Sequence, residues 1–62
     1  MTRRYIYTND IGITRLLCIN TKKDGNLEYT LWSGRGDFRG QGQMTKEEFD
    51  QFLEYYSNAY AV

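Results

Sequence analysis

The chain has 62 residues, which allows one small domain and excludes a second, because so short a chain buries only about 60% of the surface that it exposes when unfolded. Eight basic and eight acidic residues give no net charge, and the presence of one cysteine and no histidine excludes an internal disulfide, a cysteine–histidine zinc site and histidine acid–base catalysis. No apolar run is long enough for a classical secretion signal or a membrane span, so we expect no membrane contact and, with a single cysteine, a reducing cytoplasm.

The charges are distributed unevenly along the chain. Residues 1–46 carry all eight basic groups and four acidic ones, whereas residues 47–62 carry four acidic groups and no basic group. A basic segment is typical of a phosphate-binding face and an acidic segment of a surface that meets a basic partner. Ordinary solvation of exposed charges is the alternative explanation for both segments.

Three segments of the first half predict β-strands: residues 4–8, 13–20 and 27–33. The first is rich in residues that fit a pleated surface, and Asn9 with Asp10 then predicts a turn. Between the second and third segments, Asp24 and Gly25 form the strongest hairpin signal of the chain, since glycine adopts the positive φ of a tight turn.

The predicted hairpin is apolar on both faces. If Asp24 and Gly25 are a two-residue loop, one face carries Leu17, Ile19 and Trp32, and the other carries Leu16, Cys18, Tyr29 and Leu31. If the loop is longer by an odd number of residues, the strand pairing changes, but the hairpin stays apolar on both faces. One helix covers only one face, so Leu17, Ile19 and Trp32 are the predicted interface of a two-fold homodimer. Cover by the N-terminal strand and the loop is the alternative.

Residues 34–43 contain four glycines and are predicted to form a loop. A helix over about residues 46–59 follows, because Thr45 is a favourable N-cap, Glu48 completes a capping box, and Met44 is placed to pack on Phe49. Apolar residues then recur at helical spacing. Residues 1–62 are therefore predicted to be a single α+β domain, with an antiparallel sheet of two or three strands and one C-terminal amphipathic helix packed on a face.

The residue types do not predict an enzyme. Cys18 lies in an apolar strand with no histidine to activate it, so we interpret it as a small core residue. The acidic residues of the helix are expected at its N-terminal turn and wet face rather than at a metal, and no catalytic residue, metal or cofactor is predicted. One alternative is binding of single-stranded nucleic acid, using arginines and an aromatic residue of the glycine-rich loop and the N-terminal half: Arg3, Arg4, Arg15, Arg35, Arg39 and Phe38.

Several short motifs occur in a suggestive order between Ile13 and Tyr56. They are Thr14-Arg15-Leu16-Leu17, Asp24-Gly25, Glu28-Tyr29 and Thr45-Lys46-Glu47-Glu48-Phe49-Asp50. This order resembles the short, dimeric uracil-DNA glycosylase inhibitors of phages that infect Gram-positive bacteria. The resemblance implies a dimer that mimics duplex DNA, with a helix whose aromatic and acidic residues form a receptacle for the DNA-intercalating leucine of the enzyme. Phe49 and Asp50 match that helix motif, and Glu28 matches an acidic strand residue.

The chain also departs from that pattern. Leu53 stands where the family has a tyrosine, residues 34–42 are an insertion, and the chain is not acidic overall. The function expected from the resemblance is a phage-type protein inhibitor in the bacterial cytoplasm that binds a host DNA-repair enzyme. The expected partner-binding residues are Phe49, Asp50, Leu53, Glu47, Glu54, Tyr55 and Glu28. A small structural or regulatory subunit that docks through Leu17, Ile19 and Trp32 is a further alternative.

Overall fold

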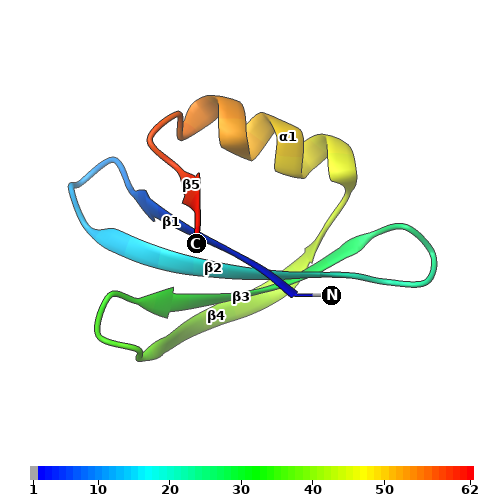
Figure 1. The fold of residues 1–62 in the computed structure, drawn as a ribbon, viewed down its shortest axis with the longest axis horizontal. Helices are drawn as coiled ribbons and strands as arrows, with labels where there is room; N and C mark the ends of the chain where they lie inside the picture. The colour runs from blue at the N-terminus through cyan, green and yellow to red at the C-terminus, as the bar shows by residue number, and fades with distance from the viewer. Residues whose placement is uncertain (1) are drawn as a thin grey trace.

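The computed structural model describes residues 2–62 and contains five strands and one helix. The strands form one antiparallel sheet in the order β4-β3-β2-β1-β5, and α1 runs along one side of it (Figure 1). In chain order the elements are β1 (Thr2–Thr8), β2 (Thr14–Thr21), β3 (Leu27–Ser33), β4 (Phe38–Met44), α1 (Lys46–Tyr55) and β5 (Tyr60–Ala61).

The predicted sheet of two or three strands is wrong, because two further strands join it. Most of the predicted loop 34–43 is β4, which pairs with β3 from Phe38 to Met44. The helix ends at Tyr55 rather than near residue 59, and the chain after it turns back so that Tyr60 and Ala61 pair with β1. Both additions are edge strands: β4 pairs with β3 across a short turn, whereas β5 pairs with β1 at the other end of the sequence.

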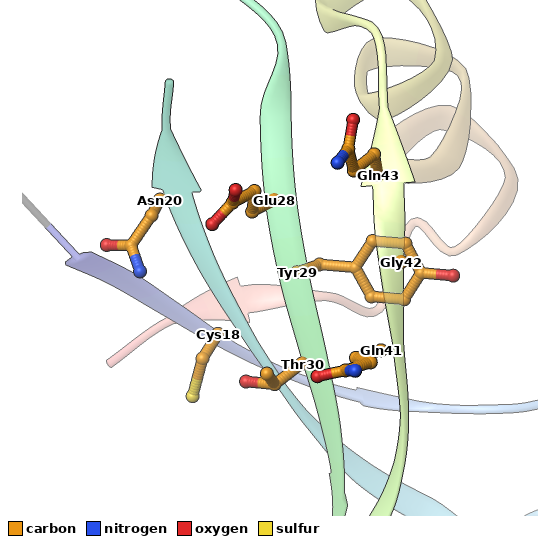
Figure 2. Close-up of a pocket in the computed structure, with 8 residues that line it drawn as sticks. All are labelled: Cys18, Asn20, Glu28, Tyr29, Thr30, Gln41, Gly42 and Gln43. Carbon is orange, nitrogen blue, oxygen red and sulfur yellow. The ribbon is translucent and has the colours of Figure 1, made fainter. Parts of the chain in front are cut away.

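One glycine of β4 leaves room for a ring from the neighbouring strand, in the space that a side chain would need. The ring of Tyr29 on β3 lies across Gly42 of β4, as Figure 2 shows. A Cβ at Gly42 would lie 2.8 Å from the hydroxyl oxygen of Tyr29 and 3.0 Å from its ring. At Gly40, two residues earlier on the same strand, a Cβ would meet nothing within 4 Å.

We therefore expect Gly42→Ala to destabilise the protein and Gly40→Ala not to. Displacing the Tyr29 ring costs about 1–3 kcal/mol, as overpacking does generally, whereas alanine at the open position changes stability by less than about 1 kcal/mol. Urea denaturation of the two variants measures the difference. Equal losses of unfolding free energy would contradict this explanation for the glycine in β4.

The three connections of the β1–β4 meander share one geometry. Each is a three-residue loop whose third residue is a glycine with positive φ: Gly12 (82°), Gly25 (90°) and Gly36 (94°). In each loop the flanking residues are joined by a backbone hydrogen bond, such as that from the Lys22 amide to the Asn26 carbonyl at 2.7 Å. The loop that contains Asp24 and Gly25 is therefore one residue longer than the two-residue loop assumed for the predicted faces, and it matches the alternative of a loop longer by an odd count.

This extra loop residue changes which side chains share a face. Leu17 pairs with Leu31 and Ile19 with Tyr29, so these residues point toward α1, whereas Trp32 pairs with Leu16 and points away from it. Leu17 and Ile19 are 2% and 0% exposed. The predicted dimer interface of Leu17, Ile19 and Trp32 is thus corrected: no face of the sheet holds all three, and two of them form the core.

The core lies between α1 and the sheet. Its buried members are Tyr7, Leu17, Ile19, Leu27 and Phe49. Aromatic contacts join the helix to β1, with ring centroids of Tyr5 and Phe49 5.4 Å apart and those of Tyr7 and Phe52 5.0 Å apart. Burial raises the pKa of the Tyr7 hydroxyl, and the nearby Tyr56 adds to this effect.

The helix begins where the sequence predicts. Thr45 Oγ1 accepts a hydrogen bond from the Glu48 amide at 3.1 Å, and Glu48 Oε1 accepts one from the Thr45 amide at 3.0 Å, which confirms the capping box. Beyond the helix, the amide side chain of Asn58 bonds both the backbone N–H and the carbonyl of Thr8. This contact fixes the path of the chain into β5.

Candidate binding surface on the open face of the sheet

A row of apolar side chains crosses the face of the sheet that points away from α1. Strand pairing places one residue from each strand in this row, which we call the apolar band: Tyr60, Ile6, Leu16, Trp32 and Phe38. Tyr60 and Phe38, at its two ends, are 57% and 52% exposed, and the three central residues are half-buried. No other helix or strand of residues 2–62 covers the band.

The indole of Trp32 is held in place within the band. Its Nε1 donates a hydrogen bond to Thr30 Oγ1 at 2.9 Å, and its ring packs edge-on against Phe38 with centroids 5.3 Å apart. Both partners lie on the same face of the sheet. A rigid, half-exposed tryptophan of this kind supplies contact area at little cost in conformational entropy.

Beside the apolar band, the same face is polar. Two rows of residues cross β1 to β4 there, which we call the polar half: Arg4, Cys18, Thr30 and Gln41, then Thr2, Asn20, Glu28 and Gln43. Most of them surround a shallow hollow of about 300 Å³ (Figure 2). Thr2 donates a hydrogen bond to Asn20 Oδ1, and Lys22 Nζ donates one to Gln43 Oε1 at 3.3 Å. The hollow thus offers carboxylate, amide and hydroxyl groups for hydrogen bonding.

Three residues of the predicted partner site lie close together on the helix side. Phe49, Asp50 and Leu53 line a hollow of about 350 Å³ beside the first turns of α1, together with Arg3 and Tyr5. However, Phe49 is only 4% exposed. Its ring packs against the ring of Tyr5, and the Arg3 guanidinium lies over it, 5.7 Å from the ring centroid. Phe49 is therefore a core residue, and almost none of its surface is free to form a receptacle.

The other predicted partner residues are dispersed. Glu47 and Glu54 are exposed on the outer side of α1, whereas Glu28 lies on the opposite face of the molecule, in the polar half. Tyr55 is 66% exposed, and its hydroxyl donates a hydrogen bond to Asp10 Oδ2 at 2.7 Å, which raises the pKa of the tyrosine. The structure therefore does not bring the full predicted set into one site.

The arginines considered for nucleic-acid binding also separate. Arg3 lies on Phe49 on the helix side and Arg4 lies in the polar half. Arg15, Arg35 and Arg39 meet at a third hollow beside the β3–β4 turn. Sequence reasoning missed the apolar band because Phe38 was assigned to a loop and Tyr60 follows the predicted helix. The even-numbered positions of Ile6, Leu16 and Trp32 on successive strands were the available signal.

Comparison with protein-family models, with curated proteins and with solved structures finds no match to the chain. Among residues 2–62, no group of three cysteine or carboxylate side chains is placed to hold a metal ion. The described helix is too short and too polar to cross a membrane. The function is therefore inferred from the geometry of the surfaces.

Proposed function

We propose that the protein is a non-enzymatic protein-binding module that dimerises through the open face of its sheet and presents its acidic helices to a basic partner. The observation that carries the proposal is the apolar band, which spans all five strands with no described element over it. The specific partner proposed is uracil-DNA glycosylase, the enzyme indicated by the resemblance of the hairpin and helix motifs. A homodimer is also what the sequence predicts, and the proposed interface now lies on the open face of the sheet, which carries Trp32.

The size of the open face is sufficient for a dimer. Four strands of seven or eight residues, about 4.8 Å apart, and the two-residue β5 present roughly 500 Å² per copy, so two copies bury about 1,000 Å², which is about the minimum for a specific interface. The single chain also exposes 4590 Å², compared with about 4,200 Å² expected for a monomer of its mass. Association through the band would remove this excess.

The charges of the open face are self-complementary. Arg4 and Glu28 are its two charged strand residues, and they lie on β1 and β3, on either side of the central strand β2. A second copy turned over about the β2 axis places its β3 against β1 of the first. Each Arg4 then comes within reach of the partner's Glu28, as a two-fold interface requires.

The helix supports the second part of the proposal. Glu47, Asp50 and Glu54 follow three-and-four spacing and form one exposed acidic stripe on α1. The ion pair found in the described chain, between Lys22 and Asp24, includes none of them. In a dimer closed through the open faces, both stripes point outward, where carboxylates can take the positions of DNA phosphates before a basic protein surface.

The experiment combines sedimentation with an enzyme assay. At micromolar concentration we expect a species of twice the chain mass, and we expect it to inhibit uracil-DNA glycosylase stoichiometrically. Asp50→Lys should remove the inhibition and leave the dimer, whereas Gln51→Lys, next to it, is the matched control. A monomer at this concentration would overturn the docking surface. A dimer without inhibition would overturn the choice of enzyme.

A further inference from the structure

Three arginines from separate elements converge on one hollow at the end of the sheet. Arg15 comes from β2, Arg35 from the β3–β4 turn, and Arg39 from the irregular pairing of β4 with β3. The hollow has a volume of about 340 Å³ and is lined in addition by Ser33, Gly34 and Asp37, among others. It is separate from the apolar band and from the acidic stripe.

The charge of this hollow is strongly positive. Asp37 is the acidic residue in its lining, so the lining residues carry three positive charges and one negative charge. Within residues 2–62, no ion pair includes any of these arginines. Guanidinium groups hold planar pairs of donors and keep their charge at all accessible pH values, which suits them to bind oxyanions by paired hydrogen bonds.

A buried hydroxyl adds a neutral donor to the same lining. Ser33 is 8% exposed, and its Oγ accepts hydrogen bonds from the Arg35 amide at 3.2 Å and the Asp37 amide at 3.1 Å. A serine hydroxyl also has one proton to donate, and no hydrogen bond in the described part of the chain uses it. An anion in the hollow would accept that bond.

We propose that this hollow is an oxyanion site for a phosphoryl group. The lining supplies a net charge of +2, which matches a phosphate dianion, and it supplies both charged and neutral donors, as phosphate sites do. The phosphoryl group can come from free phosphate or from the phosphodiester backbone of a single-stranded nucleic acid. The site is independent of dimerisation, because none of its arginines lies in the apolar band.

The test is a titration of the whole protein with two probes, inorganic phosphate and an oligothymidylate, followed by NMR shifts of the Arg35 and Asp37 amides. We expect saturable shifts and a loss of affinity of at least about tenfold in Arg39→Gln, since charge-assisted hydrogen bonds are lost. With the oligonucleotide, each lost arginine should lower the salt slope by about one. Lys23→Gln, which removes one exposed positive charge in the β2–β3 turn at the other end of the sheet, is the matched control and should retain affinity.

The two probes distinguish the sources of the phosphoryl group. Tighter binding of the oligonucleotide assigns the site to nucleic acid, and equal or tighter binding of phosphate assigns it to the free ion. Absence of saturable shifts with both probes, or equal losses in Arg39→Gln and Lys23→Gln, would overturn the proposal. Dimerisation and glycosylase inhibition are measured separately, so their failure would leave this result unchanged.

Discussion

Ile19→Ala should remove about 2–5 kcal/mol from the free energy of unfolding, as deletion of a fully buried aliphatic side chain does. Ile19 is 0% exposed and belongs to a core with five buried residues. A chain of this length has a total stability of only about 3–9 kcal/mol. The variant should therefore lose about half of its stability or more, which urea denaturation followed by circular dichroism will measure.

Ile11→Ala is the matched control for this variant. It removes the same atoms from a residue that is 78% exposed in the β1–β2 turn, where we expect a change of less than about 0.5 kcal/mol. The comparison separates the effect of burial from that of shortening an isoleucine side chain at an exposed position. Similar losses in the two variants would contradict the assignment of Ile19 to the face beneath α1.

The face assignment of Ile19 could not be predicted from the sequence. The run Leu16 to Ile19 is apolar at both parities, so hydrophobic alternation does not choose a register. Asp24 and Gly25 are equally compatible with loops of two and three residues. In the structure the choice depends on backbone bonds across the loop and on Asp24 Oδ1, which accepts from the Asn26 amide at 2.9 Å.

Local signals were reliable where the structure depends on neighbours in the sequence. The capping box of Thr45 and Glu48 is confirmed because both of its hydrogen bonds join residues three apart. In contrast, β4 was missed because its glycines disfavour a strand locally, and the reason for Gly42 is the Tyr29 ring on another strand. Strand β5 was missed because it has only two paired residues.

Some residues of the predicted partner site lie together in the structure, and others do not. Phe49, Asp50 and Leu53 were predicted together and do line one hollow, because they share the helix surface that faces the β2–β3 turn. Glu28 was predicted with them and lies on the other face, since that prediction came from motif order rather than from strand parity. The apolar band depends on the register of four strand pairs, so it required the structure.

Leu16→Asp should abolish dimerisation and keep the fold. Leu16 is the central residue of the apolar band, on the central strand β2, so a dimer through this face would bury the new carboxylate opposite the partner's band. Burial of an unpaired charge costs several kcal/mol, and we expect the dissociation constant of the dimer to rise by at least about 100-fold. Sedimentation at several concentrations measures it, with circular dichroism as the check on folding.

A charge exchange distinguishes this interface from non-specific association of an apolar surface. Arg4→Glu should weaken the dimer, because it sets two carboxylates together in each of the two symmetric contacts. Addition of Glu28→Arg restores opposite charges in the same positions and should recover most of the affinity. Association that is indifferent to all of these changes would mean that the copies do not meet through the open face.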